Sequence, residues 1–172
     1  MKNIWIINHY INNVKNNEKA ACRHRYFANE LEKRGYNVTL IYSSQEHNSD
    51  YNSIEDNSPY KIIKEEKENN VAIKTRPYKG NGKSRVLNML DFYFGCLKQY
   101  KKIVKETTKP DIIIASSVHP LACVAGIKIA KKLNIKCICE IRDLWPLSIV
   151  EYKNMSGNNP IIKALYVLEK WI

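Results

Sequence analysis

The sequence predicts a Rossmann-like α/β fold, a doubly wound and mainly parallel sheet flanked by helices. The chain has 172 residues, which suits a single domain spanning residues 1–172, and its 44% of hydrophobic residues argue against disorder. Short apolar runs also alternate with helix-length segments. In residues 110–146 this pattern predicts a strand at 111–115, a helix at 120–133 and a strand at 136–141. Strands joined through a helix lie parallel, with a right-handed crossover.

The first elements of the chain follow the same pattern. Residues 4–7 predict a buried strand close to the N-terminus, with no targeting peptide expected before it. Residues 20–34 have helical periodicity, and residues 38–42 predict the second strand. The expected apolar face of the helix consists of Tyr26, Phe27, Ala28 and Leu31.

The next part of the chain is less regular. Residues 43–60 are polar with little periodicity, which is typical of a solvated loop. Residues 60–67 and 71–75 are compatible with a hairpin that turns through Asn69 and Asn70. The second arm of this hairpin could also join the main sheet.

Two further segments have helical patterns. Residues 86–106 predict a long amphipathic helix with many large apolar side chains. Core packing is the usual reason for such a stripe, but a basic loop leading into an aromatic-rich helix also docks proteins on anionic lipid. Residues 147–152 predict a short helical or irregular segment, residues 156–159 a turn, and residues 160–172 a helix expected to continue beyond the sequence.

The formal charge of +11 favours anionic partners, namely nucleic acid, phosphate-bearing substrates or an acidic membrane, without choosing among them. Residues 74–85 are the most basic segment. Their expected phosphate or membrane contacts are Lys79, Lys83 and Arg85. A P-loop is disfavoured here, because Pro77 stands where that motif needs glycine.

Two other classes of protein fit poorly. The turn after the first strand has no glycine, which counts against a dinucleotide-binding Rossmann site. The basic residues are not interleaved with aromatics as in single-strand binders, so no nucleic-acid partner is expected. The five cysteines are expected to be reduced and buried as small hydrophobes. No run approaches the roughly 20 apolar residues that span a bilayer.

Candidate site residues come from the strand ends, where the chemistry of parallel sheets is concentrated. Asn8 and His9 follow the first strand, which should neighbour the strand at 111–115. Ser117 and His119 follow that strand, and Arg142 and Asp143 follow the next one.

Each of these residues has a less specific alternative. His119 precedes Pro120 and should cap the helix with its imidazole facing a cleft, or it merely caps the helix. Asp143 could accept a hydrogen bond from a hydroxyl or act as a base. Arg142 could bind phosphate or pair with a neighbouring carboxylate. Arg23 is a candidate phosphate ligand or an ordinary exposed arginine.

Several segments, in this order, resemble the N-terminal domain of family 4 retaining glycosyltransferases with the GT-B fold, most of all the fucosamine-transferase-like members of O-antigen and capsule assembly. These segments are residues 8–10, 23–24, 27–36, 78–82, 85–89, 115–122 and 140–146. Residues 11–18 depart from the family pattern, because they lack the glycine pair usual there.

The resemblance implies the N-terminal, acceptor-side half of a GT-B enzyme, with the nucleotide-sugar domain absent and this chain alone inactive. It implies transfer of a sugar to a polyprenyl-diphosphate-linked saccharide, without metal or cofactor, at the cytoplasmic face of the membrane. His119 would hydrogen-bond the donor sugar and orient the acceptor, and Asp143 would act on the acceptor hydroxyl. The alternative is a non-catalytic module that binds phosphate-bearing ligands or anionic membranes.

Overall fold

A computed structural model describes residues 1–11, 22–47, 49–64, 68–153 and 156–172 of the chain. Its strands are β1 (Asn3–Ile7), β2 (Asn37–Ser43), β3 (Tyr60–Lys64), β4 (Glu68–Ile73), β5 (Ile112–Ser116) and β6 (Lys136–Glu140). Its helices are α1 (Arg23–Lys33), α2 (Lys83–Glu106), α3 (Pro120–Leu133), α4 (Leu147–Lys153) and α5 (Pro160–Trp171). The described strands form one sheet in the order β3-β4-β2-β1-β5-β6. All neighbours are parallel except β3 and β4, so the predicted Rossmann-like fold is confirmed.

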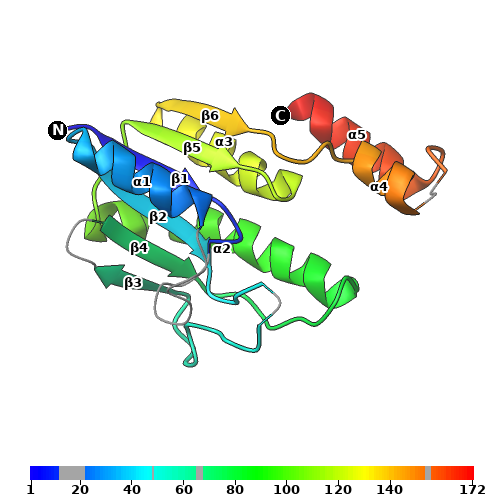
Figure 1. Cartoon of the computed structure of the whole chain (residues 1–172), viewed down its shortest axis with the longest axis horizontal. Coiled ribbons are helices and arrows are strands. Elements are labelled where there is room, and N and C mark those ends of the chain that lie inside the picture. The colour runs from blue at the N-terminus through cyan, green and yellow to red at the C-terminus, as the bar shows by residue number, and fades with distance from the viewer. Residues whose placement is uncertain (12–21, 48, 65–67, 154–155) are drawn as a thin grey trace.

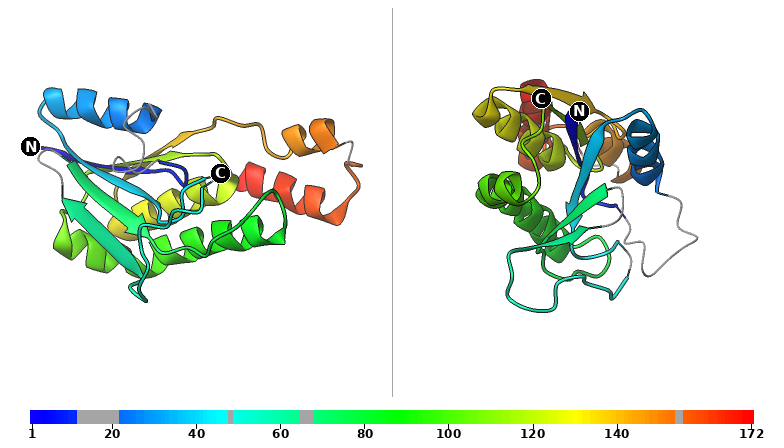
Figure 2. Two further views of the ribbon diagram at one scale, coloured as in Figure 1. Left: turned by 60° about the horizontal axis from the view of Figure 1, so that its bottom comes forward. Right: turned by 90° about the vertical axis from the view of Figure 1, so that its left-hand side faces the viewer.

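The molecule has three layers, with the sheet in the middle (Figures 1 and 2). Helix α1 lies on one face of the sheet, and α2 and α3 lie on the other. Helices α4 and α5 project beyond the carboxyl ends of β5 and β6. This arrangement leaves loops and helix ends, rather than a packed layer, around the carboxyl edge of the sheet.

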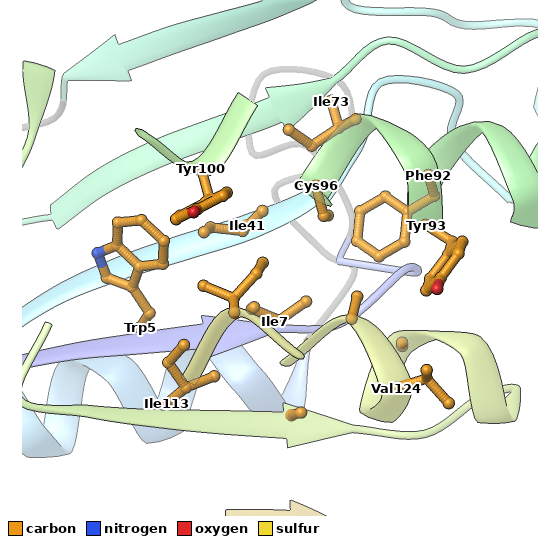
Figure 3. Close-up of a cluster of buried hydrophobic side chains, with 14 of the residues drawn as sticks. Trp5, Ile7, Ile41, Ile73, Phe92, Tyr93, Cys96, Tyr100, Ile113 and Val124 are labelled. Atoms are coloured by element: carbon orange, nitrogen blue, oxygen red, sulfur yellow. The ribbon is translucent and has the colours of Figure 1, made fainter. Parts of the chain in front are cut away.

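The main core lies between the sheet and helices α2 and α3 (Figure 3). Trp5 and Ile7 of β1 point to this side, and Phe92 of α2 and Val124 of α3 pack among them. Alternate residues of the same strand, such as Ile6, belong to a second core under α1. Strand β1 is apolar throughout because both of its faces are covered.

The hairpin prediction was correct in pairing and wrong in register. Strands β3 and β4 are antiparallel, and β4 also joins the main sheet beside β2, which the sequence left open. Asn69 and Asn70 lie inside β4 rather than at the turn, because they pair with Thr39 and Leu40 of β2. The connection at 65–67 is outside the described residues.

Two other predictions need correction. The predicted solvated loop at 43–60 has a buried start, since the Ser44 carbonyl accepts from Ser53 N–H and the Ser44 hydroxyl accepts from Thr75 N–H. On α1, Ala28 is buried as expected, but Tyr26 and Phe27 are 63% and 43% exposed, so they are not core residues. Within the described part of the chain, no helix combines the length and apolarity needed to cross a membrane.

Candidate functional site

The candidate site lies where the sheet reverses its direction of winding. Strand β1 is hydrogen-bonded to β2 on one side and to β5 on the other, and the helices that follow β1 and β5 cover opposite faces. The segments after β1 and β5 therefore meet at the carboxyl edge, as expected for a topological switch point. Asn8 ties them together: its side-chain amide donates to the Ser116 carbonyl at 3.1 Å, and its side-chain oxygen accepts from Tyr10 N–H at 2.9 Å.

Three buried side chains form a hydrogen-bonded chain at this point. His119 Nε2 lies 2.8 Å from His9 Nδ1, and His9 Nε2 lies 2.7 Å from Asn88 Oδ1 on α2. Asn88 Nδ2 in turn donates to the Arg76 carbonyl at 2.6 Å. The chain thus links the loops after β1 and β5 to α2 and the basic segment.

These contacts assign the protons of both imidazoles. Asn88 uses its amide group as donor to Arg76, so its oxygen accepts and His9 Nε2 must donate. A neutral His9 then accepts at Nδ1, so His119 Nε2 donates to it. His119 Nδ1 is left as a bare acceptor, buried and without a partner among the described residues. His119 makes no capping hydrogen bond to α3, so its side chain does not serve merely as a helix cap.

Burial keeps both imidazoles neutral. Desolvation lowers the pKa of His9 from 6.5 to about 3, outweighing the opposite effect of its hydrogen bond to Asn88. Desolvation also lowers the pKa of His119, and the neighbouring His9 and Arg85 add to this effect. Both residues are 1% exposed, which differs from the sequence expectation that they face an open cleft.

An aromatic cluster continues from His9 toward the basic segment. Tyr10 meets the His9 ring edge-on at 4.6 Å and stacks on His47 at 4.5 Å. Tyr78 is hydrogen-bonded through its hydroxyl to His47 Nδ1 at 2.5 Å. Arg85 donates from Nε to the Tyr10 hydroxyl at 3.1 Å. Arg85, predicted as a phosphate or membrane contact, is therefore also part of the site.

A pocket of about 240 Å³ opens at the carboxyl ends of β5 and β6. Ser117 and Pro120, on either side of His119 in the chain, line it together with Asp143 and Trp145. Ser117 Oγ accepts from Arg142 N–H at 3.0 Å, which leaves the hydroxyl proton of Ser117 free to donate. The Asp143 carboxylate has no ion pair or hydrogen bond with any described residue. The pocket therefore combines a free carboxylate, a hydroxyl donor and an aromatic ring.

The remaining predicted residues are placed as follows. Arg23 forms an ion pair with Glu140 at the end of β6, a partner that the sequence did not indicate. Arg142 is exposed and pairs with neither Asp143 nor Glu140. Lys79 lies 3.2 Å from Asp50, with both side chains 87% exposed. Lys83 is exposed at the start of α2.

Two functional-site residues escaped the sequence prediction. Asn88 lies on the apolar face of α2, four residues before the buried Phe92, and a buried polar side chain in that position signals a specific partner. Glu140 accepts from Ser116 Oγ at 2.6 Å and lies 3.5 Å from His24 Nε2. Although desolvation raises the pKa of Glu140, the Ser116 hydrogen bond and the Arg23 charge lower it overall, so the carboxylate is ionised.

Across the described ranges, no group of three or more His, Cys, Asp or Glu side chains is arranged to hold a metal ion. No protein-family model matches the chain, and no curated protein matches its sequence.

Proposed function

We propose that this chain is the acceptor-binding half of a glycosyltransferase that acts on a lipid-carrier-linked saccharide in surface polysaccharide assembly. The observation that most supports this proposal is the pocket lined by Ser117, Asp143 and Trp145 at the carboxyl ends of β5 and β6. A sugar has hydroxyl groups that suit a free carboxylate and a serine hydroxyl, and an apolar ring face that suits an indole. The resemblance of the strand-end segments to the GT-B family supports the same reading.

In this proposal each residue has a distinct task. Asp143 accepts a hydrogen bond from the attacking hydroxyl and takes up its proton as transfer proceeds. Ser117 donates to a second sugar oxygen. His119, kept neutral by burial and hydrogen-bonded to His9, is buried between Ser117 and Pro120 in the chain and would position these two pocket residues rather than contact the sugar. Donor binding would come from a C-terminal nucleotide-sugar domain, without which no turnover is expected.

A second candidate function is a non-catalytic module for phosphate-bearing ligands or anionic membranes. It is favoured by the exposed Lys79 and Lys83 next to Val86 and Leu87, which are 55% and 42% exposed at the start of α2. Cations beside exposed apolar side chains suit a lipid headgroup region. The two functions differ in whether the sugar contributes to binding.

Binding of a polyprenyl-diphosphate-linked monosaccharide in detergent micelles tests the proposal. We expect this ligand to bind more tightly than the same polyprenyl diphosphate without sugar. Asp143→Asn should weaken binding of the sugar-linked carrier about tenfold, because a hydrogen bond to a charged group contributes about 1.5–3 kcal/mol. The sugar-free carrier should bind the variant and the wild type equally.

Arg34→Gln is the matched control, since Arg34 is exposed at the end of α1, at the opposite edge of the sheet. It should bind both ligands like the wild type. Equal affinity of the wild-type chain for the two ligands would exclude acceptor recognition and leave the binding-module function.

A further inference from the structure

Three cysteines from two elements gather behind the pocket. Cys137 and Cys139 are two residues apart on β6, so their side chains lie on the same face of the sheet, the one covered by α3. Cys139 is paired in register with Ala115 of β5, and Cys123 of α3 donates its thiol to the Ala115 carbonyl at 3.4 Å. Cys123 and Cys139 therefore flank the same residue.

The three thiols differ in their access to solvent. Cys139 is half-buried and lines the pocket that also contains Ser117 and Asp143. Cys123 has no exposed surface. A small solute in the pocket thus reaches Cys139 first, with Cys123 directly behind it.

The remaining cysteines have different surroundings. Cys96 is buried in the α2 core, and Cys22 lies before α1 and packs in the core on the other face of the sheet. Neither lines the pocket. They serve as internal controls for general thiol reactivity.

We propose that Cys139 is a site of reversible oxidation by hydrogen peroxide, and that it forms a disulfide with Cys123. The Cys139 thiolate attacks one peroxide oxygen, the O–O bond breaks, and the hydroxide released takes a proton to form water, leaving a sulfenic acid on Cys139. The Cys123 sulfur then attacks the Cys139 sulfur, the S–O bond breaks, and the hydroxide leaves with the Cys123 proton as a second water. Two thiols are oxidised by two electrons in total, and one peroxide is reduced to two waters.

The surroundings of Cys139 favour the first step. The neighbouring thiols of Cys123 and Cys137 lower the pKa of Cys139, whereas the proximity of Cys139 and burial raise the pKa values of Cys123 and Cys137. Cys139 is therefore the first of the three to become a thiolate, which is the reactive form. Cys137 is a poor partner for a disulfide, because residues two apart on an extended strand have Cα atoms about 6.5–7 Å apart.

Formation of this disulfide would change the pocket. The bond would draw the end of β6 toward the first turns of α3, and these two elements carry Arg142 and His119 at their ends. Oxidation therefore should alter ligand access in any protein that uses this pocket. The thiol chemistry itself does not depend on the proposed glycosyl transfer.

Thiol counting after peroxide treatment tests the proposal. The reduced chain is exposed to hydrogen peroxide, quenched, unfolded and titrated. We expect the titratable thiols to fall from five to three, and dithiothreitol to restore all five. Trypsin, which does not cleave the Lys109–Pro110 bond, should yield residues 106–128 joined to residues 137–142, with a mass two hydrogens below the sum of the separate peptides.

Variants identify the partner within the second peptide, which contains both Cys137 and Cys139. Cys139→Ser and Cys123→Ala should lose the cross-link, while Cys137→Ser and Cys96→Ser should keep it. Circular dichroism of each variant before oxidation identifies any that fails to fold. Because Cys139 is half-buried, its serine variant is expected to fold and to decide the question. A cross-link that survives in Cys139→Ser or disappears in Cys137→Ser would overturn the assignment. Glutathione serves as the positive control for oxidation. If peroxide oxidises glutathione but leaves all five thiols of the wild-type chain titratable, the proposal is also overturned.

Discussion

At the scale of residues, the buried imidazoles make the stability of the fold depend on pH. The pKa of His9 falls from 6.5 in the unfolded chain to about 3 in the folded one, and that of His119 shifts in the same direction. Between these values the unfolded chain binds more protons than the folded chain. The free energy of unfolding therefore decreases as the pH falls below 6.5. The fold has its full stability only at pH values where both imidazoles are neutral in the unfolded chain as well as in the folded one.

We expect the free energy of unfolding to decrease by at least about 1 kcal/mol between pH values near 7.5 and 5.5, because one pKa unit corresponds to about 1.4 kcal/mol. Urea titrations at the two pH values measure this difference. His9→Gln should be less stable at both values but should show a smaller difference between them. A stability that increases on acidification would contradict the assignment of neutral, buried imidazoles.

The same residues show how far a site can be predicted from sequence. Asn8, His9 and His119 follow apolar runs, so their arrival at one edge of a parallel sheet is predictable. Their burial was not, because it depends on Tyr10, Phe92 and the aromatic cluster packing around them. The partner of Arg23 was also missed, since Glu140 lies more than a hundred residues away and only the sheet order brings them together.

At the scale of elements, the contact between α3 and β5 depends on a glycine. A methyl group at Gly126 would lie 2.5 Å from the Ala115 side chain and 3.4 Å from Cys137 Sγ. The Ala115 Cβ cannot rotate away, because it is attached directly to the backbone. Helix α3 can thus approach the sheet this closely only if position 126 has no side chain.

We expect Gly126→Ala to lower the free energy of unfolding by about 1–3 kcal/mol, the usual cost of overpacking. This loss would occur although alanine favours helix by up to about 1 kcal/mol over glycine. Urea titration of the variant measures the change. The double variant Ala115→Gly with Gly126→Ala removes the obstructing methyl group and should recover part of the loss. A Gly126→Ala chain as stable as the wild type would show that α3 can shift without cost.

The elements themselves were predictable where burial follows a regular period. Strands β1, β2 and β5 and helices α2 and α3 fall close to their expected positions for this reason. The register of the hairpin was not predictable. Asparagines usually indicate a turn, but Asn70 is buried within β4, where tertiary pairing outweighs local preference.

At the scale of the whole molecule, only some of the basic side chains are free to contact an anionic surface. The Arg76 guanidinium donates two hydrogen bonds to the Asp91 carboxylate, and the Arg85 guanidinium donates to the Tyr10 hydroxyl. Lys83 is exposed, and the Lys79 pair with Asp50 is of the exposed kind that contributes little. Lys79 and Lys83 are therefore the cations of the basic segment best able to meet an anionic surface, next to the exposed apolar start of α2.

We expect the chain to bind vesicles that contain anionic lipid and not vesicles of neutral lipid alone. Lys79→Glu with Lys83→Glu should weaken this binding about thirtyfold, because each basic residue near such a surface contributes about 1 kcal/mol. The matched control, Lys101→Glu with Lys102→Glu, makes the same change of charge about 27 Å along α2. This separation exceeds the screening length of about 8 Å at physiological salt, so the control should bind nearly as well as the wild type. Vesicle co-sedimentation measures both. Equal losses in the two variants would mean that net charge alone attracts the chain to the membrane, and that the start of α2 is not the docking surface.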